Sequence, residues 1–182
     1  MLGRRLALLR ARLLEQGLRV TWLWAWDHCV RFTMGAPRIA TSRLTPHLLV
    51  GGQYRHRGWR RLAAAGVTGV LSLRQEFCDR EAGIAPERYL RLPTPDDAAP
   101  TLEQLREGVN FIDEEARHGG AVYVHCGAGV GRAATMAAAY LVSQGMAPER
   151  AWAQIRAVRP FIRPTAPQRI ILQQWAARVH GG

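Results

Sequence analysis

Residues 122–135, VYVHCGAGVGRAAT, form the most informative stretch of this sequence. It opens as a short apolar run typical of a buried strand, turns through glycines at 127, 129 and 131, and continues as an alanine-rich helical pattern. Alternate glycines let the backbone curl so that successive N–H groups point inward around a tetrahedral anion. A helix that begins near Arg132 directs its free N–H groups to the same place. The stretch therefore predicts an anion-binding loop between a strand and a helix.

This loop carries a candidate nucleophile and a candidate phosphate-binding arginine. We expect Cys126 to be a thiolate, the nucleophilic form, because a helix N-terminus and a neighbouring arginine stabilise the ionised sulfur. Arg132 follows Cys126 by six residues, so the loop can fold back and present a planar guanidinium to two phosphate oxygens, which lysine could not reproduce. The expected catalytic residues are Cys126 and Arg132, and the expected phosphate-binding residues are Gly127, Ala128, Gly129, Val130, Gly131 and Arg132.

Two nucleotide-binding motifs and a purely structural cysteine are the alternatives to a catalytic loop here. The glycines are spaced as GxGxG, whereas dinucleotide-binding loops have GxGxxG, and no Gly-Lys-Ser/Thr follows for a nucleotide P-loop. The remaining alternative is a buried structural cysteine beside an ordinary turn, which would make the cysteine, the glycines and the arginine a coincidence. We assign His125 to support of the loop, because a lone histidine is more often a packed, hydrogen-bonded side chain than a catalyst.

The rest of the chain predicts one α/β domain. With 182 residues, 48% of them hydrophobic and 21% charged, the chain has the size and composition of a globular domain plus an extension. Thr101 is an expected helix N-cap with Gln104 at the capping-box position, and glycines 119–120 should end that helix. Strand-like runs occur at 47–52, 67–73, 88–93 and 121–124, and helical patterns at 58–66, 102–120, 131–145, 148–159 and 166–179.

Residues 1–39 are the expected N-terminal extension, and residues 40–182 the expected domain. Leucines at 2, 6, 9 and 13 lie on one helical stripe among arginines, which predicts an amphipathic helix. Three tryptophans follow, Trp22, Trp24 and Trp26, and then a Gly- and Pro-containing linker at 35–39. We expect this segment to contact an anionic membrane surface as a peripheral element. The alternative is that the helix and the tryptophans pack against the domain.

The net charge and the cysteine content limit the possible binding partners and the expected cellular compartment. The chain has 25 basic and 14 acidic residues, a net charge of +11, and every basic residue is arginine. Its excess charge suits phosphorylated substrates, acidic lipid surfaces or nucleic acid, and charge alone does not choose among them. Cys29, Cys78 and Cys126 form no CxxC and no zinc-type His/Cys pair. We therefore expect no disulfide, no metal and a reducing compartment, the cytoplasm.

Cys126, five residues and Arg132, preceded by His125, resemble the protein-tyrosine-phosphatase signature, and the short domain resembles the dual-specificity branch over roughly residues 44–178. Within that branch the chain is most similar to mitochondrial-type and bacterial lipid-directed members. The resemblance implies an α/β fold with a central, mostly parallel sheet flanked by helices. It also implies hydrolysis of a phosphomonoester through a phosphocysteine intermediate, without metal or cofactor. The implied substrate is a phosphoprotein, or alternatively a phosphoinositide or phosphatidylglycerophosphate, and no nucleic acid is expected.

The resemblance further implies a general acid on a mobile loop about 30 residues before the cysteine, where LPTPDDAAPT lies. Asp96 and Asp97 are both candidates, and similarity to TPDxxxPT patterns favours Asp96 as the third catalytic residue. Either aspartate could instead be a turn residue in this proline-rich loop.

Ala133 departs from the family pattern, which places Ser or Thr directly after the arginine to help the thiolate leave. Thr135 lies further along the helix and is not expected to substitute. Breakdown of a phosphocysteine should then be slow, so a phosphate-binding pseudophosphatase is a second alternative function. Cys78 lies in a region where some relatives hold a cysteine that traps the oxidised nucleophile, although a lone cysteine is most often a small buried hydrophobe.

Overall fold

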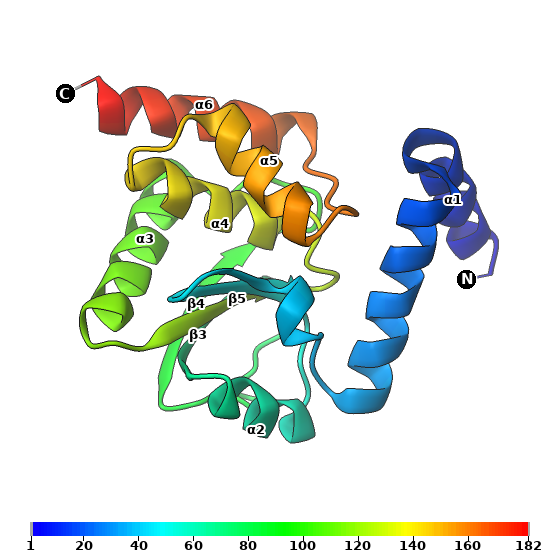
Figure 1. The fold of residues 1–182 in the computed structure, drawn as a ribbon, viewed down its shortest axis with the longest axis horizontal. Coiled ribbons are helices and arrows are strands. Elements are labelled where there is room, and N and C mark those ends of the chain that lie inside the picture. The colour runs from blue at the N-terminus through cyan, green and yellow to red at the C-terminus, as the bar shows by residue number, and fades with distance from the viewer. Residues whose placement is uncertain (1, 182) are drawn as a thin grey trace.

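The computed structural model describes the backbone of residues 2–181 and the side chains of residues 13–181 (Figure 1). The extension forms helix α1 (Leu2–Met34), and a short 3-10 turn η1 (Ile39–Thr41) leads into the sheet. The strands are β1 (Arg43–Thr45), β2 (Leu48–Gly52), β3 (Val67–Arg74), β4 (Arg88–Thr94) and β5 (Ala121–Cys126). The other helices are α2 (His56–Ala64), α3 (Leu102–Arg117), α4 (Arg132–Ser143), α5 (Pro148–Val158) and α6 (Ala166–His180).

The five strands form one mixed sheet in the order β1-β2-β5-β3-β4. Only β1 is antiparallel to its neighbour, and the other pairings are parallel. The expected α/β fold with a central, mostly parallel sheet is therefore confirmed. The sequence patterns missed β1, a three-residue edge strand with an irregular register, because so short a run carries no recognisable alternation. β5 lies at the centre, so the loop that follows Cys126 emerges between β2 and β3.

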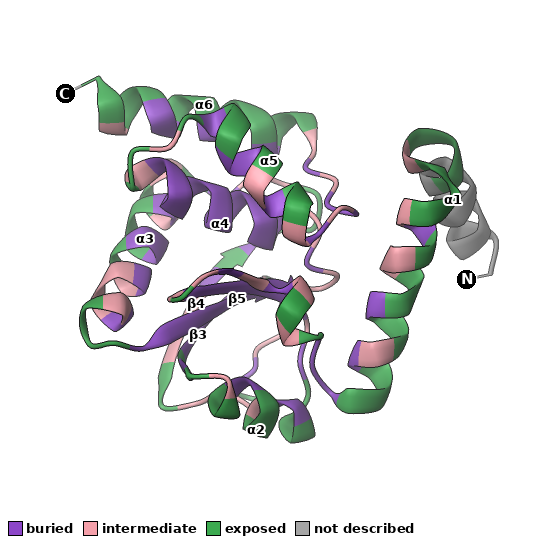
Figure 2. Cartoon of the chain, in the orientation of Figure 1, coloured by how far each residue is buried: buried purple, intermediate pink, exposed green. Residues whose placement is uncertain are grey.

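Helices cover both faces of the sheet (Figures 1 and 2). Val122 and Val124 of β5 point into the larger core, which is built with α3, α4, α5 and α6. Tyr123 points to the opposite face, where Leu62 of α2 closes a smaller core. Every residue of α4 from Arg132 to Val142 is buried (Figure 2). This explains its alanine-rich sequence, since small side chains let the helix lie close to the sheet and to its helical neighbours.

The α3 capping prediction is confirmed. The Thr101 side chain accepts a hydrogen bond from Gln104 N at 3.1 Å, and Gln104 Oε1 accepts one from Thr101 N at 2.9 Å. Gly119, with φ of +77°, follows the end of the helix, because glycine adopts this left-handed conformation without steric cost. The start of α3 matters for the site because the loop before it carries Asp96.

α1 extends beyond the expected amphipathic helix to Met34, with a sharp kink at Gly17 (φ 77°, ψ 170°). Three members of the predicted leucine stripe, Leu2, Leu6 and Leu9, lie outside the residues whose side chains are described, and Leu13 is 39% exposed. Among the described residues, no helix combines the length and the apolar character needed to cross a membrane.

The second half of α1 faces the domain with polar side chains. Thr21, Asp27 and Arg31 are buried, whereas Trp22 and Trp26 remain 62% and 45% exposed. The two exposed indoles stack on each other, with ring centroids 5.6 Å apart. The helix therefore packs against the domain, as the alternative expected, but not through these two tryptophans.

Candidate active site

The loop after β5 has the predicted strand–loop–helix geometry. Cys126 is the last residue of β5 and Arg132 the first of α4. The Cys126 side chain is 3% exposed, and its Sγ accepts a hydrogen bond from Gly129 N at 3.3 Å. Gly129 has φ of +71°, and a Cβ there would lie 2.2 Å from the carbonyl carbon of Gly51. Only glycine fits here, so this loop conformation requires a glycine at position 129.

Two carbonyl groups of the loop are held away from its interior. The Gly127 carbonyl accepts a hydrogen bond from Gln53 N at 3.0 Å, and the Val130 carbonyl accepts one from Arg163 N at 2.8 Å. No peptide bond is cis between residues 2 and 181, and in a trans peptide the N–H points opposite to the C=O. The amides that follow these two carbonyls are therefore directed toward the inside of the loop, where an anion would accept them.

The Arg132 guanidinium is buried and held from several sides. Its Nη1 and Nη2 lie 2.9 and 3.0 Å from the two carboxylate oxygens of Glu76, and Nη1 donates to the Thr94 carbonyl at 2.8 Å. Nη2 also lies 2.8 Å from Asp96 Oδ1. Its Nε has no acceptor among the residues the structure describes, although Arg132 is only 2% exposed. A buried donor without an acceptor is costly, so a phosphate oxygen is a suitable ligand for it.

Glu76 fixes the arginine electrostatically, and it was not identified from the sequence. The hydrogen bond from Arg132 lowers the pKa of Glu76 to about 2, so its carboxylate is ionised at neutral pH. A bidentate carboxylate fixes both the position and the plane of a guanidinium. Glu76 follows the carboxyl end of β3, the strand beside β5. An acidic residue at that end of a neighbouring parallel strand was the one signal that could have found it.

His125 is a buried, hydrogen-bonded residue below the loop. Its Nε2 lies 2.7 Å from Asp79 Oδ2, and both side chains are fully buried. Gln53 Nε2 donates to the other oxygen of Asp79 at 2.8 Å, and the Tyr54 ring meets the imidazole edge-on. Asp79 was also missed by sequence analysis, since nothing local links it to a histidine 46 residues away.

The two candidate acids occupy different positions. The Asp96 side chain is 79% exposed and reaches inward to Arg132. Asp97 has φ of +61°, a rare conformation for a residue other than glycine, and its carbonyl accepts a hydrogen bond from Thr165 Oγ1 at 3.0 Å. Gln168 Nε2 donates to the next carbonyl, that of Ala98, at 2.8 Å.

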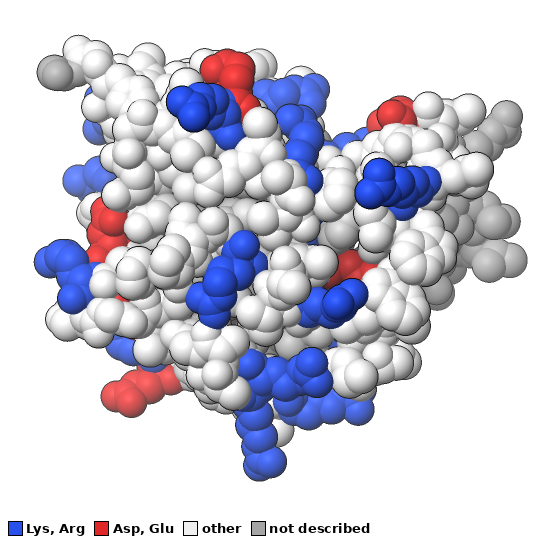
Figure 3. All heavy atoms as spheres, in the orientation of Figure 1, with Lys and Arg blue, Asp and Glu red and all other residues white. Residues whose placement is uncertain are grey.

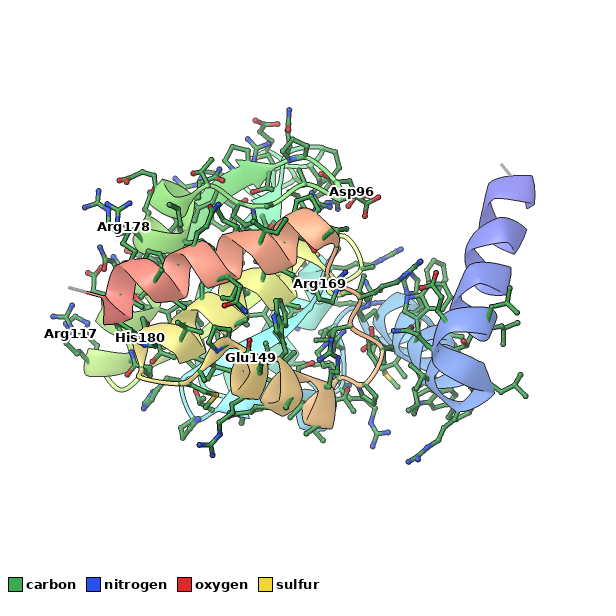
Figure 4. The ribbon with its side chains drawn as sticks, turned by 90° about the horizontal axis from the view of Figure 1, so that it is seen from above. Asp96, Arg117, Glu149, Arg169, Arg178 and His180 are labelled. Atoms are coloured by element: carbon green, nitrogen blue, oxygen red, sulfur yellow. The ribbon has the colours of Figure 1, made fainter. Side chains whose placement is uncertain are left out.

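The N-terminus of α6 thus holds the loop that carries both aspartates. Figure 4 shows Asp96 on the side of the domain that faces α1, beside the end of α6 that carries Arg169. An open hollow of about 470 Å³ is lined by Gln75, Glu76, Pro95 and Asp96. Two of its lining residues, Glu76 and Asp96, contact the Arg132 guanidinium, so the hollow adjoins the end of the loop.

Comparison with known proteins identifies the family. The family described as "Polymorphic toxin system, DSP-PTPase phosphatase" matches residues 51–146. Human phosphatidylglycerophosphatase and protein-tyrosine phosphatase 1 is 32% identical over 147 residues, covering 75% of this chain and 73% of that protein. The chain belongs to the dual-specificity branch of the protein-tyrosine phosphatases. It is accordingly a phosphatase.

Other members of the dual-specificity branch agree with this assignment. Mouse dual specificity protein phosphatase 8 is 31% identical over 130 residues, although the chain spans only 20% of that protein's length. The crystal structure of PTPMT1 superimposes with a TM-score of 0.70 and 31% identity, covering 77% of this chain and 96% of that one. Human DUSP28 gives a TM-score of 0.67 at 25% identity.

The residue that follows Arg132 is alanine, whereas the family pattern has serine or threonine at this position. Ala133 is fully buried and brings no hydroxyl to the loop. Thr135, one turn into α4, donates its hydroxyl to the Gly131 carbonyl at 3.1 Å. Cys29, Cys78 and Cys126 are all free thiols, and Cys78 is half-buried.

Proposed function

We propose that this chain hydrolyses phosphomonoesters in two steps through a phosphocysteine on Cys126. In the first step the thiolate attacks phosphorus, an S–P bond forms, and the leaving oxygen departs with a proton from Asp96. In the second step water attacks phosphorus, gives its proton to Asp96, and the S–P bond breaks to release phosphate and the thiolate. Arg132 and the loop amides hold the equatorial oxygens throughout. The buried Nε of Arg132, which has no acceptor among the described residues and lies at the other end of the loop from Cys126, is the observation that supports this most directly.

The proposed acid is Asp96, because its carboxylate lies at the phosphate-binding arginine while Asp97 is held through its backbone. Replacing Asp96 with asparagine should lower kcat on an alkyl phosphate by roughly 10²–10⁴-fold, the usual effect of losing a positioned proton donor. The loss should be much smaller on an aryl phosphate whose leaving group departs without protonation. Steady-state kinetics on both esters measure the two effects.

Asp97→Asn is the matched control, because asparagine tolerates the positive φ at this position. We expect it to stay within a few-fold of wild type on both esters. If Asp97→Asn carries the large loss and Asp96→Asn the small one, the acid is Asp97.

The substrate class follows from a side-by-side turnover assay on a phosphotyrosine peptide, a phosphoinositide and phosphatidylglycerophosphate. We propose dual-specificity protein phosphatase activity first. A lipid phosphate is the second candidate, supported by the apolar stripe on α1, which consists of Leu14, Leu18, Trp22 and Trp26. A burst of released leaving group followed by very slow turnover on every substrate would identify a protein that holds phosphate without efficient hydrolysis, as Ala133 would allow.

We further propose that the apolar stripe docks the chain on an anionic membrane surface from the cytoplasm. Its four members are 45–80% exposed. Leu18, Trp22 and Trp26 follow one another at intervals of four after the kink at Gly17, which keeps these three on one side of the helix, and Leu14 lies before the kink. Contiguous exposed apolar side chains of this size mark interaction surfaces. Arginines outnumber acidic residues on the face shown in Figure 3, in keeping with the net charge of +11, and this charge complements acidic headgroups.

Replacing Trp22 and Trp26 together with serine should weaken binding to vesicles that contain acidic lipid by tenfold or more. Each indole offers on the order of 100 Å² to the interface, about 2 kcal/mol of apolar transfer. Binding should also fall as salt rises. Co-sedimentation with acidic and neutral vesicles measures both effects. Ile170→Ser, which alters an exposed apolar residue on α6, is the control, and equal binding by all three proteins would contradict docking through the stripe.

A further inference from the structure

A side chain from the N-terminal helix reaches the phosphate-binding loop. Nη1 of Arg31 donates to the Gly127 carbonyl at 3.3 Å, across 96 residues of sequence. Arg31 is 7% exposed. A Cβ on Gly52 would lie 2.5 Å from this same nitrogen, so the glycine at the end of β2 leaves the space that the guanidinium occupies. The Arg31 guanidinium therefore fits closely against the end of β2.

The same guanidinium is anchored at its other edge. Nε of Arg31 lies 3.0 Å from Asp27 Oδ2, one turn earlier on α1. Asp27 is 4% exposed and also pairs with the fully buried Arg159 at 3.4 Å. Arg159 in turn donates to the Thr41 carbonyl at 2.9 Å. Buried charges are tolerated when they are paired and hydrogen-bonded, and this network holds Arg31 in one orientation toward the loop.

The orientation of the Gly127 carbonyl determines where the N–H group of Ala128 points. It accepts hydrogen bonds from Arg31 and from Gln53 N on the outer side of the loop. Because the peptide that joins Gly127 to Ala128 is planar and trans, holding its oxygen outward holds the Ala128 N–H inward. If this carbonyl could rotate, the loop would lose one of the donors expected to surround the phosphate.

A second contact from α1 acts on the same loop in a similar way. Gln16 Nε2 donates to the Ile162 carbonyl at 3.2 Å. The peptide group that contains this carbonyl also contains Arg163 N, which donates to the Val130 carbonyl of the loop at 2.8 Å. Two peptide planes of the phosphate loop are thus supported by residues from the N-terminal extension, one directly and one through an intervening peptide.

We propose that Arg31 is a positioning residue, which sets the anion-binding orientation of the Gly127–Ala128 peptide and makes α1 a working part of the active site. This rests on the proposed function of the loop. Arg31 touches neither substrate nor sulfur in this scheme, and it acts through the loop backbone. The consequence is that oxyanion affinity, and not only stability, depends on a residue in the extension.

The test compares Arg31→Ala, Arg31→Lys and Arg57→Ala in the full chain. The readouts are kcat, KM, thermal midpoint, and the inhibition constant of tungstate, a tetrahedral oxyanion that needs no chemical step. Losing one preorganised donor costs about 10²–10³-fold, and Gln53 N still holds the carbonyl. We therefore expect Arg31→Ala to weaken tungstate inhibition and lower kcat/KM by about tenfold each.

Arg31→Lys should restore the thermal midpoint, because the ammonium still pairs with Asp27, but should leave tungstate inhibition weak, because Arg31 reaches Asp27 and the Gly127 carbonyl with two different nitrogens and lysine has only one. Arg57→Ala removes a 2.7 Å contact to the carbonyl of Phe32 on α1 without touching the loop, and it should match wild type in tungstate inhibition.

Tungstate inhibition at the wild-type level in folded Arg31→Ala, or in Arg31→Lys if the alanine variant does not fold, would overturn the positioning role. Failure of the proposed function is distinguishable, since it would appear as full turnover by Cys126→Ser in an otherwise wild-type chain.

Discussion

Cys126→Ser should abolish phosphatase turnover while leaving the fold intact. The expected loss in kcat is on the order of 10⁴–10⁶-fold, as in other enzymes that lose the nucleophile of a covalent mechanism. Serine is nearly isosteric with cysteine and can still accept the hydrogen bond from Gly129 N. The chemical reason for the loss is that a serine hydroxyl is a far weaker nucleophile than the cysteine thiolate that a covalent mechanism requires. Steady-state assays on an aryl phosphate give the rate.

Two measurements accompany this variant. Circular dichroism and the thermal midpoint should be unchanged, which shows that the loss is chemical. Tungstate should still bind to the serine variant, because Arg132 and the loop amides remain. Near-wild-type turnover by folded Cys126→Ser protein would rule out the phosphocysteine route and would leave the loop with a binding role alone.

Arg132→Lys should lower kcat/KM by roughly 10³-fold or more. Removing one preorganised donor costs about 10²–10³-fold, and this change removes the paired geometry of the fork even though it keeps the positive charge. Lysine also cannot occupy both oxygens of Glu76, which Arg132 contacts at 2.9 and 3.0 Å. Both kcat and the affinity for tungstate should therefore fall.

Arg88→Lys is a matched control for this substitution, because Arg88 on β4 pairs with two carboxylates of α3, Glu114 and Glu115, away from the loop. It should stay within a few-fold of wild type. If Arg132→Lys retains the kcat/KM of the wild type, the positive charge alone is sufficient and the fork has no special role.

The local parts of this protein could be predicted from its sequence. The strand, the loop and the helix of residues 121–143 follow from the apolar run, the alternate glycines and the alanines, which act within a few residues of one another. The α3 capping box is similarly local, since Thr101 and Gln104 are one turn apart. Such patterns can be recognised in the sequence because the residues that interact are only a few positions apart.

The partners that complete the site could not be predicted in this way. Glu76 lies 56 residues from Arg132, and Asp79 lies 46 residues from His125. Acidic residues in loops are common, so the position of Glu76 after a strand was only a weak signal, and the contacts form because the parallel strands bring their carboxyl ends to one edge of the sheet. The hydrophobic pattern of α1 left open which side of the helix faces the domain, and the structure shows Thr21, Asp27 and Arg31 buried while Trp22 and Trp26 are exposed.

The strand, the glycine turn and the helix that carry the proposed nucleophile and anion-binding loop could be predicted from sequence alone, because backbone conformation and helix N–H groups are local properties. The contacts that hold this loop became visible only in the folded protein. Sheet order placed Glu76 and Asp79 beside it, the start of α6 held the backbone that follows Asp96, and α1 folded back so that Arg31 meets the Gly127 carbonyl. Those contacts depend on packing between segments that are far apart in the sequence, and the spacing of residues does not show which segments will pack together.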